Sequence, residues 1–145
     1  MMNYDNGTLK LELPDRWQVF GSTDVEGKEN PKRIYVYKDV DAPFEIFSRA
    51  GITVSYYDDE DYYLPTRGFY DNVRDIEPIE LGGRVWQGYT CLSLGYPYVM
   101  LEHFWGERVL FLMVLLKNGE YEISMDDDDV RSIIGSISII EKTEE

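Results

Sequence analysis

Apolar and polar residues alternate along several short segments of this chain, as they do in β-strands that bury one face. The clearest case is Thr8 to Leu13, where three leucines share one side and Pro14 ends the run, because proline cannot donate to a sheet. Segments 33–38, 44–48 and 52–57 are β-branched or aromatic and predict three more strands. The polar segment 21–32, rich in turn-forming residues, predicts a mobile loop.

From Arg84 onward, long extended segments are divided by short turn signals, which predicts a four-stranded antiparallel meander. Asn118-Gly119 is typical of a two-residue type I′ hairpin turn. With that turn, Leu116 would face Tyr121 and Val114 would face Ile123. The segment 108–117 is apolar on both sides, so it is expected to be a central strand covered on both faces in a layered sandwich.

Two helices are predicted from residues that recur at helical spacing. In segment 66–77, Phe69, Val73 and Ile76 lie at i, i+4 and i+7, with Thr66 as an N-cap and Pro78 as the end.

The second predicted helix follows four successive aspartates, residues 126–129. Apolar residues at 130, 133 and 134 share one face, Asp126 fits the N-cap, Asp129 could complete a capping box, and Gly135 suits the end. Weak binding of divalent cations is the alternative use of the aspartates, although they lack the spacing of an EF-hand loop. Segment 136–140 predicts a last short strand. Together these elements predict one α+β domain over residues 1–145, with seven or eight largely antiparallel strands and two main helices.

The charge and cysteine content exclude several classes of function. Twenty-eight acidic side chains against fourteen basic ones give a net charge of −14, which repels phosphate backbones and anionic lipids, so neither nucleic acid nor a membrane is an expected partner. The single cysteine, Cys91, allows neither an intrachain disulfide nor a thiolate metal site, and no cofactor or metal is predicted. A cytoplasmic protein is expected, or a secreted or lipid-anchored one if a signal was trimmed.

One acidic and tyrosine-rich segment is the candidate binding site, because consecutive aromatic residues in a polar loop cannot all point inward. The residues in question are Tyr56, Tyr57, Asp58, Asp59, Glu60, Asp61, Tyr62 and Tyr63. In one interpretation they form an exposed surface that contacts a basic or amphipathic protein segment, or less readily a sugar ring. In the other, the loop packs on its own sheet.

Other candidate catalytic groups are few. Strand alternation places His103 on an apolar face, as for a hydrogen-bonded structural histidine, and directs Glu102 to the opposite face. Cys91 is interpreted as a small buried residue instead of a nucleophile.

The order of the elements, with Leu13-Pro14-Asp15-Arg16-Trp17 after the first strand and Ile134-Gly135-Ser136-Ile137 near the end, resembles the PsbP-like superfamily. That group includes the extrinsic protein of photosystem II, the yeast Ran-binding protein Mog-one and bacterial DcrB-like proteins. The resemblance implies an antiparallel sheet flanked by helices, an α/β/α-type sandwich, and binding, accessory or chaperone-like roles. It transfers no functional residue to this chain.

The sequence therefore predicts a non-enzymatic binding or accessory protein that uses residues 56–63. A hydrolase that uses Glu102 or His103 with a loop carboxylate is one alternative. A structural subunit of a homo-oligomer, paired through an exposed sheet edge, is another.

Overall fold

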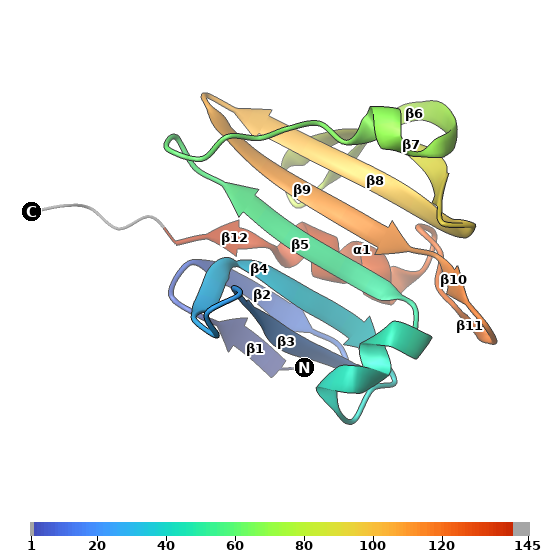
Figure 1. Cartoon of the computed structure of the whole chain (residues 1–145), viewed down its shortest axis with the longest axis horizontal. Coiled ribbons are helices and arrows are strands. Elements are labelled where there is room, and N and C mark those ends of the chain that lie inside the picture. Colours follow the sequence, from blue (N-terminus) through green and yellow to red (C-terminus); the bar gives the residue numbers. More distant parts are fainter. Residues whose placement is uncertain (1, 141–145) are drawn as a thin grey trace, which may run out of the picture.

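The structure is a computed structural model, and it describes residues 2–140. Seven strands form one antiparallel sheet in the order β3-β4-β5-β9-β8-β7-β6 (Figure 1). These strands are β3 (Trp17–Thr23), β4 (Glu29–Lys38), β5 (Gly51–Tyr57), β6 (Asp71–Leu81), β7 (Arg84–Ser93), β8 (Tyr96–Trp105) and β9 (Arg108–Leu115). As the sequence predicts, β9 lies at the centre, and most of its side chains are buried whichever face they point to.

A second layer covers the back of this sheet (Figure 1). It consists of a three-stranded sheet, β1-β2-β12, and one α-helix. Their bounds are β1 (Met2–Asp5), β2 (Leu9–Leu13), β12 (Ser138–Ile139) and α1 (Asp128–Ser136). The predicted alternation of β2 is confirmed, because its three leucines are buried in the main core between the layers, together with the apolar face of α1.

The front face of the large sheet carries a smaller core. Tyr89, Cys91, Met100 and Phe111 form its centre, from β7, β8 and β9. Residues 58–70, here called the strap, cross the upper part of this face between β5 and β6 (Figure 1). The remaining elements are the 3-10 helices η1 (Pro43–Ser48) and η2 (Arg67–Phe69) and the hairpin of β10 (Lys117–Asn118) and β11 (Tyr121–Glu122).

The predicted α+β class, an α/β/α-type sandwich with two main helices, is wrong. The chain is 56% strand and 13% helix, and it has one helix of seven residues or more. The protein is therefore a mainly antiparallel β-protein in which a small sheet and a single short helix cover the back of the large sheet.

The helix predicted over residues 66–77 is an edge strand, β6, preceded by η2. Its pairing with β7 shifts register twice, between Asp71 and Arg74 and between Ile76 and Ile79. Each shift inserts one extra residue, as a β-bulge does. The half-buried side chains of β6 at 73, 76 and 79 therefore recur at every third position instead of every second, a spacing that resembles the period of a helix.

Two further segments differ from prediction because of their turn chemistry. Segment 44–48 is the 3-10 helix η1, in which Pro43 occupies the first turn and Glu45 Oε1 accepts a hydrogen bond from the Ala42 N–H at 3.0 Å. The predicted mobile loop 21–32 instead belongs largely to the β3-β4 hairpin. Its turn is closed by Asp24, whose N–H donates to the Lys28 carbonyl at 2.8 Å and whose carboxylate accepts from two turn amides.

The Asn118-Gly119 hairpin exists, but its register and extent are not those predicted. Asn118 pairs with Tyr121, so the turn residues are Gly119 and Glu120. Gly119 has a φ of +61°, as the first residue of a type II′ turn requires. The hairpin has two residues on each side and stands apart from the large sheet, so the predicted fourth strand of the meander is replaced beside β9 by β5.

The short helix after the four aspartates is confirmed, but its caps differ. Asp127 is the N-cap residue, and its carboxylate accepts a hydrogen bond from the Ser124 N–H at 2.8 Å instead of capping the helix. Asp126 is exposed, and the Asp129 carboxylate binds Trp17 and Lys38. The helix continues through Gly135 to Ser136.

Candidate functional site

The strap is fixed to the front face by two inward-pointing tyrosines. The Tyr63 ring lies 4.9 Å from the Tyr57 ring and 5.9 Å from the Phe111 ring, centroid to centroid. Tyr70 packs on the same small core, and its hydroxyl lies 2.8 Å from Thr66 Oγ1. These contacts hold residues 63–70 in one conformation across β8 and β9.

A hydrogen bond beneath the strap joins it to the sheet. The Tyr63 hydroxyl donates to Glu102 Oε2 of β8 at 2.5 Å. Burial, and next the adjacent Glu102 carboxylate, raise the pKa of Tyr63 well above its ordinary value. Burial, with Tyr70 and Glu102 nearby, also raises the pKa of Tyr89 to about 12. The phenols under the strap therefore stay protonated at neutral pH and can act as hydrogen-bond donors.

The acidic half of the strap is held by two basic residues. Lys32 Nζ of β4 lies 2.7 Å from Asp58 Oδ2 and 2.8 Å from Asp61 Oδ2. The hydrogen bond from Lys32 keeps the pKa of Asp58 below its usual value. Arg108 Nε donates to Asp59 Oδ1 at 3.0 Å. Glu60 is exposed, and within residues 2–140 no ion pair involves its carboxylate.

The four predicted tyrosines have different environments, so they do not form one exposed patch. Tyr56 is buried in the main core and stacks on Trp105. Tyr57 and Tyr63 are half-buried in the front core, and the loop packs on its own sheet at these positions. Tyr62 is exposed, with 82% of its surface accessible. Of the tyrosines from 56 to 63, Tyr62 is the one whose ring is free to contact a partner.

The exposed surface of the strap is more apolar than the sequence predicts. Leu64 is 55% exposed and Phe69 is 78% exposed, on the same segment as Tyr62. Phe104 of β8, whose ring lies 6.0 Å from that of Tyr63, is 45% exposed. The sequence pattern does not predict Leu64 and Phe69 as site residues, because it places Phe69 in the core face of a helix over residues 66–77; Gly68, which disfavours an α-helix, is the signal against that helix.

A hollow of about 380 Å³ adjoins the exposed end of the strap. It is lined by residues 30–33 of β4, residues 55–57 of β5, and Asp61 and Tyr62 of the strap. This volume is in the range of sites that accept a small molecule or a large side chain. The predicted residues Tyr57, Asp61 and Tyr62 therefore meet at one concave site, together with the basic residues Lys32 and Arg33.

The residues of the hydrolase hypothesis are not brought together. Glu102 faces the strap and binds Tyr63, whereas His103 lies on the back face, where its Nδ1 is 2.9 Å from the Val85 carbonyl oxygen and its ring packs between Trp86 and Trp105. The carboxylates of the loop 58–61 bind instead the basic residues named above or remain exposed. The predicted opposite orientation of Glu102 and His103 is confirmed.

The remaining candidate residues have structural partners. Asp129 Oδ2 accepts from Trp17 Nε1 at 2.9 Å and lies 3.0 Å from Lys38 Nζ. Burial opposes ionisation of Asp129, but the Trp17 and Lys38 donors outweigh it, and the pKa lies below its usual value. Cys91 is 4% exposed, and its burial raises its pKa.

Across residues 2–140, no group of three or more His, Cys, Asp or Glu side chains is placed to hold a metal ion. No helix in this part of the chain is long and apolar enough to cross a membrane.

Comparison with known proteins assigns no family. No family model matches the chain, and no curated protein matches it. A solved structure from Bacteroides thetaiotaomicron VPI-5482, determined at 1.50 Å resolution, is similar over 97% of this chain and 48% of its own, with 8% sequence identity and a TM-score of 0.49. This chain thus spans about half the length of that structure. The resemblance to the PsbP-like superfamily stays a prediction.

Proposed function

We propose that the protein is a non-enzymatic binding module whose strap docks a basic, amphipathic segment of a partner protein. The observation that carries this proposal is the exposure of three large apolar side chains, Tyr62, Leu64 and Phe69, on a segment that also carries four carboxylates. Exposed apolar groups rimmed by charge are the usual composition of a protein-binding surface.

The geometry of the strap favours binding because the segment is already ordered. Tyr63 and Tyr70 anchor it from below, and Lys32 ties Asp58 and Asp61 to β4. A partner therefore meets side chains that are held in place, and less conformational entropy is lost when the complex forms. The hollow beside Tyr62 offers room for one large side chain of the partner.

The negative charge of the strap and of the whole chain favours a positively charged partner. Residues 58–70 hold four acidic residues and one arginine, a charge of −3 that Lys32 and Arg108 partly offset, in a chain of net charge −14. This field attracts a cationic segment and repels an anionic one, and the attraction weakens as salt is added. A segment with lysines or arginines on one face and apolar residues on the other matches both features of the strap.

Fluorescence anisotropy with a labelled synthetic amphipathic helix of lysine and leucine tests this function. We expect the native protein to bind this peptide and not a matched helix of glutamate and leucine. The double substitution Tyr62→Ser with Leu64→Ser should weaken binding by about tenfold or more, since two apolar contacts are lost.

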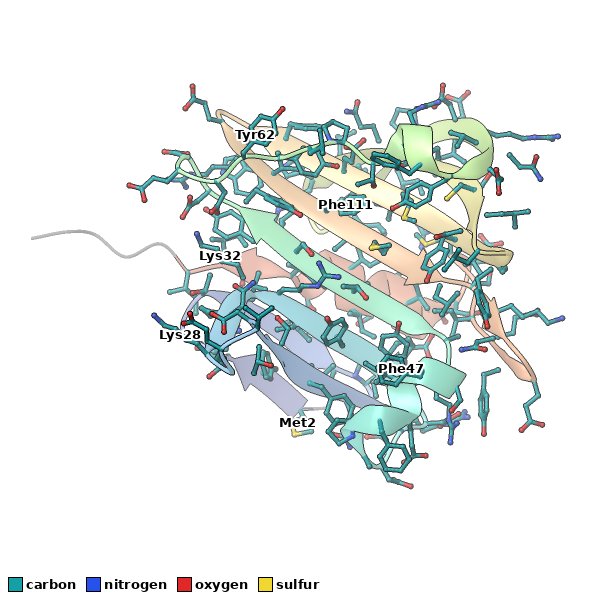
Figure 2. The ribbon with its side chains drawn as sticks, viewed as in Figure 1. Met2, Lys28, Lys32, Phe47, Tyr62 and Phe111 are labelled. Carbon is teal, nitrogen blue, oxygen red and sulfur yellow. The ribbon has the colours of Figure 1, made fainter. Side chains whose placement is uncertain are left out.

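Phe47→Ser is the matched control. Phe47 is also 82% exposed, but it belongs to η1, and Figure 2 shows it at the opposite end of the sheet from Tyr62. The strap is not the docking site if the control and the double substitution weaken binding equally, or if both peptides bind with the same affinity.

A further inference from the structure

The two outer edges of the seven-stranded sheet are protected to very different degrees. The β6 edge carries two register shifts, Pro78, and four acidic residues against one arginine, a local charge of −3. Bulges, proline and charge are the devices by which proteins prevent other strands from pairing with a sheet edge. The β3 edge, Trp17–Thr23, contains no charged residue and no proline.

The β3 edge is also free of other elements. β3 pairs with β4 on one side, and among residues 2–140 no backbone hydrogen bond outside that ladder involves residues 18–21. Gln18 and Gly21 are exposed, and Val19 and Phe20 are partly exposed. Half of the backbone N–H and C=O groups of residues 18–21 therefore face outward with no backbone partner among the described residues.

We propose that β3 pairs antiparallel with β3 of a second copy of the chain, so that two large sheets join edge to edge. This inference is independent of the strap, which lies over the other half of the sheet. The shift between Gly21 and Ser22 limits regular pairing to residues 17–21. The centre of that stretch, Val19, then lies on the two-fold axis.

This register of β3 brings no like charges together. The Trp17 backbone lies opposite Gly21 of the second copy, and Gln18 lies opposite Phe20 of the second copy. The Trp17 side chain is 2% exposed and stays in the core of its own chain.

Charge also favours this edge over the rest of the surface. Two chains of net charge −14 repel one another, and an uncharged strand is where they approach with the least repulsion. In this register Arg16 of each copy lies just beyond the paired stretch, at the end nearer the β3-β4 turn of the other copy, which carries Asp24 and Glu26. Arg16 binds Asp39 of its own chain, but its side chain is 64% exposed and a guanidinium has donors for a second carboxylate.

The expected dimer is weak. Five paired residues on each chain bury less than the roughly 1,000 Å² that a permanent interface requires, so the dimer should form reversibly and depend on protein concentration. Sedimentation equilibrium of the full chain over a wide concentration range measures this dependence directly.

Gln18→Lys is the diagnostic substitution, because it brings two like charges close together across the two-fold axis. We expect it to raise the dimer dissociation constant about fivefold. Gln87→Lys is the matched control, since Gln87 is also exposed but lies on β7, an inner strand. Amide hydrogen exchange of the native chain provides a second readout: the outward amides of residues 18–21 should become protected as concentration rises.

The proposal is overturned if the native chain stays monomeric at every concentration, or if it dimerises without protecting the β3 amides. It is equally overturned if Gln87→Lys weakens the dimer as much as Gln18→Lys. Should Gln18→Lys fail to fold, as circular dichroism would show, hydrogen exchange of the native chain still decides.

Discussion

The hydroxyl of Tyr63 is the part of the strap whose contribution to stability can be isolated most cleanly. Tyr63→Phe removes the donor of the 2.5 Å hydrogen bond to Glu102 and leaves the ring contacts with Tyr57, Phe104 and Phe111 in place. A hydrogen bond to a charged group contributes about 1.5–3 kcal/mol. Because Glu102 is half-buried, water can partly replace the lost donor, and we expect a loss of about 1–2 kcal/mol in the free energy of unfolding.

Urea denaturation at neutral pH measures this loss, and the adjacent Tyr62 supplies the control. Tyr62→Phe makes the same chemical change on an exposed ring and should alter the free energy of unfolding by less than about 0.5 kcal/mol. Both substitutions should leave the denaturant slope unchanged, because neither alters the surface that unfolding exposes.

A double-mutant cycle with Glu102→Leu identifies the partner. If the hydroxyl acts through Glu102, the double variant should lose less stability than the sum of the two single variants. Equal effects of Tyr63→Phe and Tyr62→Phe, or strictly additive effects with Glu102→Leu, would refute the view that this bond fixes the strap.

Three further predictions concern the turn before β7, the aspartates before α1 and the buried phenols. Gly82→Ala should lower the free energy of unfolding by at least about 2 kcal/mol, because Gly82 has a φ of +62° and an added Cβ would overlap the Gly135 carbonyl oxygen of α1. Gly83→Ala should lower it less, because Gly83 has a φ of +79° but open space around it; thermal melting of the two variants measures the difference. Asp129→Ala should cost about 2 kcal/mol in urea denaturation because it strands a buried indole donor, and Asp126→Ala, which removes no cap, should stay within about 0.5 kcal/mol. Folding raises the pKa of Tyr89 from 10.0 to about 12, so the unfolded chain loses the Tyr89 proton at a lower pH than the folded chain does. The contribution of Tyr89 to stability is therefore complete below pH 10, and above that pH the free energy of unfolding should fall by up to about 1.4 kcal/mol per pH unit. Tyr89→Phe should make this fall with pH less steep.

Strands and the helix that bury one clean face were predictable from the sequence. The leucines of segment 9–13 and the apolar face of α1 follow the periods of 2 and 3.6 residues, and these elements occur where predicted. The pattern of β6 misleads for a physical reason: two bulges convert a strand into a three-residue repeat, which resembles a helix.

The candidate site was only partly predictable, because side-chain direction in the strap depends on residues far along the chain. Tyr62 and Tyr63 are adjacent and chemically identical, yet one is exposed and the other is half-buried. The difference comes from Glu102 and Phe111, which lie about 40 or more residues away in sequence and receive the Tyr63 hydroxyl and ring. Local composition locates the segment and leaves the orientation of each ring undetermined.

β5 pairs with the central strand β9 because β5 is the more apolar strand, although the Asn118-Gly119 turn favours the segment that follows β9. A strand that pairs next to β9 must be buried on both faces, because β9 itself is covered on both sides. Segment 120–125 carries Glu120 and Glu122 and would place carboxylates in that layer, whereas six of the seven residues of β5 are buried. The desolvation cost of two carboxylates exceeds the loop-closure cost of a long-range pairing, which grows only slowly with loop length. The two arms of the hairpin therefore stay paired only as far as the hydrogen bond from the Ile123 N–H to the Leu116 carbonyl, and β9 pairs instead with β5, a more apolar strand from further away in the sequence.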